Sequence, residues 1–420
     1  MKPLSQFLLC GLLPSAGLAS SSYQKQLGGL DLDSKPQLAA PSYRKHLLET
    51  HKQLVEISSI SGHEVPVANF LHTYLPTLGF ETWLQALPAS NTSWGYLPER
   101  YNVVARPRSD ASHSSSAAAR VLVTSHMDVV PPYIPYHIDA PSSEEITGST
   151  IISGRGSVDA KASVAAQIIA VEELVASKAI NASDVMLLFV VGEETLGDGM
   201  RFFSDSLQSH SNSTSLKAAI FGEPTENKLA CGHKGITFGS ISAKGKAGHS
   251  GYPWLGKSAT EVLIRALGKI LEHDFGKSER YGNTTVNIGK IEGGVAANVI
   301  PKEAQAEISL RIAIGDQKNG ADIIRKQLKS ILEEVDSEAL SLESKGGYGP
   351  VECFCDVDGF ETMVANYGTD VPHLAGDHVS YLYGPGSILV AHGDDEALRV
   401  GDLEEAVEGY KKLVKHALEA

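Results

Sequence analysis

Acidic and imidazole side chains follow several apolar runs of this sequence, at the points where the runs end. The residues are His126, Asp128, Glu193, Glu194, Glu223 and His392. A carboxylate beside a buried strand is costly unless it is paired, bound to a metal or protonated. These side chains are therefore candidates for metal binding and for acid–base chemistry.

The apolar runs predict the sheet that would bring these side chains together. The runs "RVLVTSHMD", "VMLLFVVGEE", "KAAIFGEP" and "GSILVAHGDD" are rich in branched aliphatic residues without polar alternation. This pattern is typical of strands that are covered on both faces. Helical patterns such as "ASVAAQIIAVEELVASK" separate them. We expect an α/β fold with a mostly parallel sheet flanked by helices, whose ligands bind outside the carboxyl ends of the strands.

Residues 234–343 interrupt this pattern with a different order of predicted strands and helices. Its order of strand, helix, strand, strand, helix and strand indicates an inserted ferredoxin-like α+β domain. One of its strands has apolar residues at every second position from Ala306 to Ile314, which predicts a half-solvated antiparallel sheet. The expected organisation is a catalytic domain in two parts, 42–233 and 344–420, around a lid or dimerisation domain at 234–343.

The first residues have the pattern of a secretory signal. Lys2 precedes the apolar stretch from Phe7 to Leu13, and small residues suited to cleavage follow near Ala19. We expect a signal peptide over 1–19, a leader or pro-segment over 20–41, and a secreted protein without a membrane span. Glycosylation sequons that fit this route begin at Asn91, Asn181, Asn212 and Asn283.

Charge and cysteine content exclude other classes of protein. The formal net charge of -14 and the absence of a Lys/Arg cluster argue against a nucleic-acid partner. Without the signal segment the cysteines are Cys231, Cys353 and Cys355, so at most one disulfide forms and one thiol remains. A scaffold held by several disulfides is thereby excluded, and the Cys353/Cys355 pair is interpreted as structural.

A metal site would account for the acidic and imidazole residues taken together. Imidazole nitrogen and carboxylate oxygen are ligands that suit zinc and leave positions open for water. In this interpretation His126 binds through one nitrogen, and Asp128 accepts the proton of the other. Simpler alternatives are solvated His-x-Asp pairs and helix caps. Asp159 in "SGRGSVDAKAS", considered alone, is best interpreted as an N-cap.

Six motifs occur in the order found in a known enzyme family. They are "TSHMDVVPP", "GRGSVDAK", "VVGEETLGDGM", "FGEPT", "GHSGYP" and "GGVAANVIP". From about residue 45 to its C-terminus the chain resembles the two-zinc metallo-exopeptidases, which include aminoacylase, acetylornithine deacetylase, succinyl-diaminopimelate desuccinylase and glutamate carboxypeptidase. Within that family it is most similar to a secreted zinc carboxypeptidase.

The resemblance implies a set of metal ligands. His126 and Glu223 would hold one zinc, Glu194 and His392 the other, and Asp159 would bridge both. A cis peptide bond often follows the bridging aspartate in this family.

The resemblance also implies residues that act on the substrate. Glu193 would be the general base and Asp128 would orient His126. In the lid, His249 would help to polarise the substrate carbonyl, sometimes from a partner subunit, and Asn298 would contact the substrate carboxylate. The inserted domain often mediates dimers in this family, so a homodimer through the lid is expected.

The function expected from the sequence is zinc-dependent hydrolysis of small peptides or N-acyl amino acids by a secreted carboxypeptidase-type enzyme. An N-acyl amino acid amidohydrolase is the first alternative. A non-catalytic binding protein on the same scaffold is the second, but its expected sign is loss of Glu193 or Asp159, and both are present. Arg311, on the polar face of its strand, either binds a carboxylate or is solvated.

Overall fold

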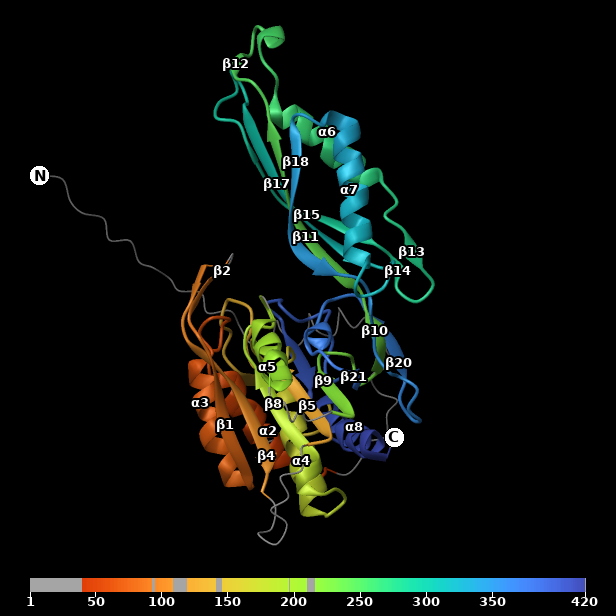
Figure 1. Ribbon diagram of the computed structural model, residues 1–420. Coiled ribbons are helices and arrows are strands. Elements are labelled where there is room, and N and C mark those ends of the chain that lie inside the picture. Colours follow the sequence, from red (N-terminus) through yellow and green to blue (C-terminus); the bar gives the residue numbers. More distant parts are fainter. Residues whose placement is uncertain are drawn as a thin grey trace, which may run out of the picture.

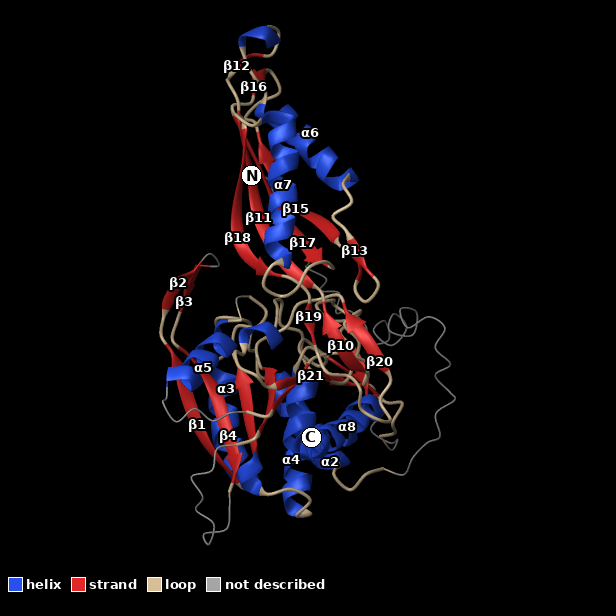
Figure 2. Cartoon of the chain, turned by 45° about the vertical axis from the view of Figure 1, so that its right-hand side comes forward, coloured by secondary structure: helices blue, strands red, loops and turns tan. Residues whose placement is uncertain are grey.

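The computed structural model describes residues 40–92, 95–108, 119–140, 146–195, 197–209 and 216–419. The predicted signal peptide, most of the leader and the sequon at Asn212 lie outside these ranges. The chain forms a layered α/β unit and an elongated lid that projects from it (Figures 1 and 2). Within the described ranges, no helix combines the length and the apolar character needed to cross a membrane.

A nine-stranded sheet forms the centre of the larger unit. Its order is β1 (Phe80–Leu87), β4 (Arg100–Pro107), β8 (Val185–Val190), β5 (Val121–His126), β9 (Ala218–Gly222), β21 (Val379–Tyr383), β10 (Leu229–His233) and β19 (Val351–Glu352), with β20 (Thr362–Ala365) also beside β10. The central strands β8, β5, β9 and β21 are parallel, and antiparallel pairs flank them. The predicted α/β fold with a parallel centre is confirmed.

Helices cover both faces of this sheet, which is why its central strands are mostly apolar on both faces. The helices are α2 (Arg44–Glu56), α3 (Val65–Tyr74), α4 (Lys161–Ala176), α5 (Asp198–Ser209) and α8 (Val400–Glu419). On β5, Val121 and Val123 join the core that contains α4 and α8, while Leu122 joins the core on the other face with Met200 and Phe203 of α5. Burial on both faces fixes the strands and therefore fixes where their last residues lie.

The lid is the segment from β11 to β18. Its elements are β11 (Gly235–Lys244), α6 (Ala259–Glu272), β15 (Thr285–Gly293), β17 (Glu303–Ile312), α7 (Gly320–Asp336) and β18 (Leu340–Tyr348). The strands form an antiparallel sheet in the order β15-β17-β11-β18, and α6 and α7 share its apolar core. The predicted ferredoxin-like order is confirmed, and the last strand runs past the predicted end at 343.

Short elements complete the described chain. They are the pairs β2 (Ser90–Thr92) with β3 (Gly95–Leu97), β12 (Gly248–His249) with β16 (Val299–Ile300) and β13 (Lys277–Ser278) with β14 (Gly282–Asn283), and the sheet of β22 (Ala397–Arg399), β7 (Ile151–Ser153) and β6 (His137–Ile138). The β12–β16 pair lies at the end of the lid that is farthest from the larger unit (Figures 1 and 2).

Two paired segments connect the lid to the larger unit. The chain enters the lid from β10 into β11 and returns from β18 into β19, and β10 pairs with β19 just as β11 pairs with β18. A disulfide between Cys231 and Cys355 links these two connections, and Cys353 is a buried free thiol. This agrees with the expectation of at most one disulfide and one remaining thiol.

One predicted strand is wrong. Residues 386–390 of "GSILVAHGDD" form bends and turns apart from one bridge between Thr225 and Ser387, and Leu389 is 70% exposed. The strand that occupies this place in the sheet is β21, whose aromatic residues Tyr381 and Tyr383 are buried. Aromatic residues favour strands as strongly as branched aliphatic ones do, and Gly386, with φ 77°, turns the chain away before the apolar run.

Candidate metal centre

The five predicted ligands lie together at the carboxyl ends of the central strands. Their ligand atoms form two groups, each within 4.8 Å: His126, Asp159 and Glu223, here called the inner triad, and Asp159, Glu194 and His392, the outer triad. Each triad offers one imidazole nitrogen and two carboxylate oxygens. The two triads share Asp159.

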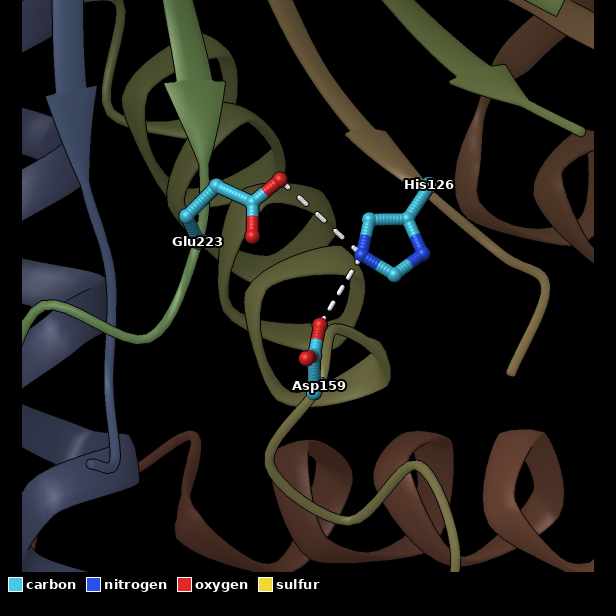
Figure 3. A group of neighbouring side chains, drawn as sticks. All are labelled: His126, Asp159 and Glu223. Carbon is cyan, nitrogen blue, oxygen red and sulfur yellow. Dashed lines mark hydrogen bonds and ion pairs between the residues drawn. The ribbon is translucent and has the colours of Figure 1, made fainter. Parts of the chain in front are cut away.

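The inner triad is held by the sheet. His126 is the last residue of β5, Glu223 follows β9, and Asp159 lies in the turn before α4 (Figure 3). Nε2 of His126 lies 3.0 Å from Oδ1 of Asp159 and 3.9 Å from Oε1 of Glu223. All three side chains are nearly buried. The three ligand atoms therefore surround a point that is shielded from bulk water.

The outer triad is open to the surface through His392, while its two carboxylates are nearly buried. Nε2 of His392 is 3.2 Å from Oδ2 of Asp159 and 3.1 Å from Oε1 of Glu194. The side chain of His392 is 50% exposed, and its backbone is in the left-handed region, with φ 64°. Because Oδ1 of Asp159 faces His126 while Oδ2 faces His392, the two oxygens of one carboxylate serve different triads.

Asp159 does not cap the helix that follows it. The peptide bond between Asp159 and Ala160 is cis, in agreement with the resemblance, and Ala160 is the N-cap of α4 without a side-chain hydrogen bond. The N-cap interpretation of Asp159 is thus wrong, because its carboxylate contacts the two imidazoles instead.

Asp128 is bonded differently from the sequence prediction. Nδ1 of His126 lies 3.0 Å from the carbonyl oxygen of Asp128 but 3.7 Å from its carboxylate, so the carbonyl is the closer acceptor. The Asp128 carboxylate accepts the backbone N–H groups of Glu193, at 3.1 Å, and Glu194, at 3.3 Å, and the hydroxyl of Ser61, at 2.7 Å. Asp128 therefore fixes the turn that carries both acids.

The pKa values of Glu193, Glu194 and Glu223 are raised because these carboxylates are desolvated and lie near other negative charges. Burial and the nearby Glu223 carboxylate raise the pKa of Glu193 well above its ordinary value. Burial also raises the pKa of Glu223 well above its usual range, against the effect of His126. Burial and Asp159 raise the pKa of Glu194 to about 7. A bound cation would relieve this mutual repulsion.

The pKa values of the two imidazoles are raised as well, whereas that of Asp159 is lowered. Hydrogen bonds to Asp159 and Glu194 raise the pKa of His392 to about 10. Burial opposes the effect, but the hydrogen bond to Asp159 holds the pKa of His126 well above its usual value. Burial would raise the pKa of Asp159, yet the hydrogen bonds from His126 and His392 lower it. Both shifts of the imidazole pKa favour the charged form beside the carboxylates.

The predicted substrate-binding residues lie in two different places. Arg311, near the end of β17, is half-buried at the base of the lid; burial lowers its pKa, and Tyr348 and the Glu193 carboxylate oppose this shift. His249 in β12 and Asn298 directly before β16 are both exposed, and this strand pair lies at the far end of the lid (Figure 1). Within one chain, therefore, the structure brings Arg311 near the triads but leaves His249 and Asn298 away from them.

The described sequons are accessible. Asn91, Asn181 and Asn283 are exposed, and the side chain of Asn181 donates to Asp184 at 3.1 Å. Their modification stays a prediction.

Three charged residues near the triads were missed by sequence reasoning. Asp370 is buried and contributes to the raised pKa of both Glu193 and Glu223. Arg155 and Glu396 form a buried ion pair of 2.6 Å. Arg155 and Glu396 lie in the stretches "GRGSVD" and "HGDDE", which contain the predicted ligands Asp159 and His392, so proximity to those ligands was the available signal. The stretch "GTDVP" around Asp370 carried no such signal.

Comparisons with known proteins agree with this architecture. Residues 231–339 match the family described as the peptidase dimerisation domain, M20_dimer. A peptidase M20 domain-containing protein of Sordaria macrospora is 62% identical over 91% of this chain and 87% of its own length. A probable carboxypeptidase of Aspergillus oryzae is 42% identical over the full length of both chains.

Solved structures share the fold at low sequence identity. An M20 family metallo-carboxypeptidase from Sulfolobus solfataricus has a TM-score of 0.65 at 17% identity, over 89% of this chain and 99% of that one. A Bacillus subtilis protein described as a dinuclear metal binding peptidase has a TM-score of 0.59 at 16% identity, over 90% and 99%. With the full-length relatives, these findings confirm the family that the sequence motifs suggested. The chain belongs to the M20 peptidase family, whose members are metal-dependent, and it is a hydrolase that acts on peptide bonds.

Proposed function

We propose that this protein is a two-zinc carboxypeptidase that removes the C-terminal residue of small peptides. The observation that carries the proposal is the Asp159 carboxylate, whose two oxygens face separate imidazoles, 3.0 Å from His126 and 3.2 Å from His392. One nitrogen and two oxygens in each triad suit zinc and leave room for water. The buried, mutually repelling acids fit a site that binds cations, and a structural neighbour is described as binding two metals.

Glu193 is suited to move protons in this reaction. Two bound cations would lower the pKa of a water between them and polarise the scissile carbonyl. Glu193 lies on the same turn as Glu194 but belongs to neither triad, and burial raises its pKa well above the usual value. Its carboxylate can take a proton from that water and return it to the leaving nitrogen. Asp128 holds the turn in place for this role.

Arg311 supports the assignment to C-terminal residues. It is a half-buried guanidinium at the lid base, and the Glu193 carboxylate is close enough to favour its charged form against the effect of burial. A guanidinium binds a carboxylate through two parallel hydrogen bonds. A substrate whose free carboxylate reached Arg311 would place its last amide bond toward the triads. Arg311→Ala should raise KM for such substrates by about 10- to 100-fold, as expected for a lost bond of 1.5–3 kcal/mol to a charged group.

His249 and Asn298 act from a partner subunit in this proposal. The β12–β16 pair in or beside which they lie is far from the triads of its own chain, and the lid matches a dimerisation domain. In a homodimer joined through the lids, His249 of the partner subunit would help to polarise the substrate carbonyl and the partner subunit's Asn298 would contact the substrate carboxylate. Mixing inactive His249→Ala and Glu193→Gln chains should then restore part of the activity, because one composite site would be intact.

Secretion is proposed on two features. The apolar stretch from Phe7 to Leu13 has the pattern of a signal peptide. The disulfide between Cys231 and Cys355 suits an oxidising compartment. Glycans at the exposed sequons would follow from that route, and mass spectrometry of the exported protein would detect both cleavage near Ala19 and the glycans.

The decisive experiment compares three substrates. An N-blocked dipeptide, the same dipeptide with an amidated C-terminus, and an N-acetyl amino acid are assayed with and without a chelator. We expect hydrolysis of the first to exceed that of the second by at least the factor assigned to Arg311, and to disappear with chelator. Preference for the N-acetyl amino acid would instead favour an amidohydrolase. Activity that survives complete metal removal would reject the metal mechanism.

The base is tested by Glu193→Gln. Turnover should fall by about 10²- to 10⁴-fold while zinc content stays at the wild-type value. Glu334→Gln, on an exposed acid of α7, is the matched control and should leave kcat unchanged. Ordinary turnover in Glu193→Gln would reject the base assignment.

A further inference from the structure

A buried ion pair connects the segments that carry Asp159 and His392. Nη1 of Arg155 lies 2.6 Å from Oε2 of Glu396, and each side chain is only 1% exposed. Neither residue belongs to a triad. Burying two charges is expensive unless further hydrogen bonds satisfy the remaining donors and acceptors. The further hydrogen bonds of Arg155 and Glu396 therefore indicate what the pair does in the structure.

Glu396 holds the backbone of the bridging aspartate. Its Oε1 accepts the N–H of Val158, at 3.0 Å, and the N–H of Asp159, at 3.1 Å. The Glu396 backbone carbonyl accepts from the Ser157 hydroxyl at 3.2 Å and from the Gly154 N–H at 3.1 Å. Glu396 thus accepts hydrogen bonds from both ends of the turn, from Gly154 at its start and from Ser157, Val158 and Asp159 at its end.

Arg155 holds the turn that carries His392. Its Nη2 donates to the carbonyl of His392 at 3.2 Å, and its Nη1 donates to the carbonyl of Gly393 at 3.1 Å. His392 has a left-handed backbone, which a residue other than glycine adopts at a cost and keeps only when neighbouring contacts hold it. The guanidinium supplies two of those contacts.

We propose that the Arg155–Glu396 pair is a positioning device that sets the separation of Asp159 and His392, and thereby the affinity of the outer triad for its metal. The pair joins the two turns directly, because its carboxylate binds one and its guanidinium the other. The inner triad needs this link less, since His126 and Glu223 are placed by β5 and β9. This inference rests on the proposed two-metal site.

The test uses variants that separate the two halves of the link. Glu396→Gln keeps an oxygen for the N–H groups of Val158 and Asp159 but sets an amide against Arg155, so the guanidinium loses its anchor. Arg155→Lys keeps a positive charge but cannot reach the carboxylate and both carbonyls together. Glu404→Gln is the control, because it removes a mostly buried ion pair between α2 and α8, with Arg44.

Metal-free full-length chains are titrated with Zn²⁺ against a chromophoric chelator, and their thermal unfolding is recorded without metal. In Glu396→Gln and Arg155→Lys we expect the weaker-binding zinc to lose about 10- to 100-fold in affinity, the range for outer-sphere partners of metal ligands, while the tighter one changes by less than about threefold. Glu404→Gln should bind both zincs as the wild type does, even if its unfolding temperature falls equally.

The inference is overturned if Glu396→Gln binds both zincs with wild-type affinity, or if both sites weaken equally and Glu404→Gln behaves in the same way. Failure of the wild-type chain to bind two zincs would instead refute the proposed two-metal site itself. The two failures are therefore distinguishable in one titration series.

Discussion

The two triads share Asp159 but are built from different parts of the fold. His126 and Glu223 of the inner triad end or follow parallel strands that are buried on both faces. Glu194 and His392 of the outer triad lie on turns held by hydrogen bonds, and the His392 side chain is half exposed. Close packing makes a strand end hard to displace, whereas a turn moves when one of its bonds is lost. The inner site should therefore be robust and the outer site adjustable.

The largest expected effect comes from removing each imidazole in turn. His392→Ala should weaken only the outer zinc, by at least about 100-fold, and leave one zinc per chain. His126→Ala should weaken both, because three crowded carboxylates lose their balancing group and Asp159 loses the partner of its Oδ1. Elemental analysis after gel filtration measures the zinc content. Loss of both metals in His392→Ala would break the distinction between a robust and an adjustable site.

A smaller effect is expected from Asp128→Asn, which probes the turn of Glu193 and Glu194. An amide keeps one acceptor but opposes a backbone N–H with its own N–H, so one of the two backbone bonds is lost. At about 1.4 kcal/mol for a bond to a charged group, outer zinc affinity should fall about tenfold. Ser61→Ala, which removes only the hydroxyl that donates to Asp128, should have a milder effect in the same Zn²⁺ titration. Weakening of the inner zinc alone would contradict this account.

The last prediction concerns stability, not metal binding, and a buried histidine outside the triads. Carboxylates raise the pKa of His392 to about 10, whereas burial lowers the pKa of His233, bonded to the Lys234 carbonyl and the Thr369 hydroxyl, to about 4. Between pH 6.5 and 4, His233 then binds more protons in the unfolded chain than in the folded chain. The free energy of unfolding should therefore fall as the pH is lowered through that window.

His233→Asn, which retains the donor to the Lys234 carbonyl, should remove up to about 1.4 kcal/mol per pH unit of that slope. Denaturant unfolding of metal-free wild type and variant at several pH values gives the difference. Equal slopes would show that His233 is not a neutral, buried imidazole in the folded chain.

Much of the inner triad could be predicted because it follows from strand patterns. The apolar runs before His126 and Glu223 are strands β5 and β9, and a parallel sheet brings their ends to one edge. The alternation from Ala306 onward likewise predicted β17 and its buried face. In both cases a short-range pattern determines which face or end of a strand a residue occupies.

The rest depends on contacts that no short-range pattern records. The apolar run before His392 was misread as a strand because branched aliphatic residues also occur in exposed turns. The link from Arg155 to Glu396 joins positions far apart in the chain. The place of His249 at the far end of the lid follows from the length of β11 and its neighbours, which motif spacing does not specify.

The cross-link between Cys231 and Cys355 has a consequence for a chain that meets other proteases. It closes a covalent loop around the entire lid, because the bonded residues are separated by 124 positions in the sequence. A single cut in any lid loop, for instance in the exposed segment after β12 that carries Trp254, would leave both fragments in one molecule. Such a nicked protein would run as one band without reductant and as two bands with it.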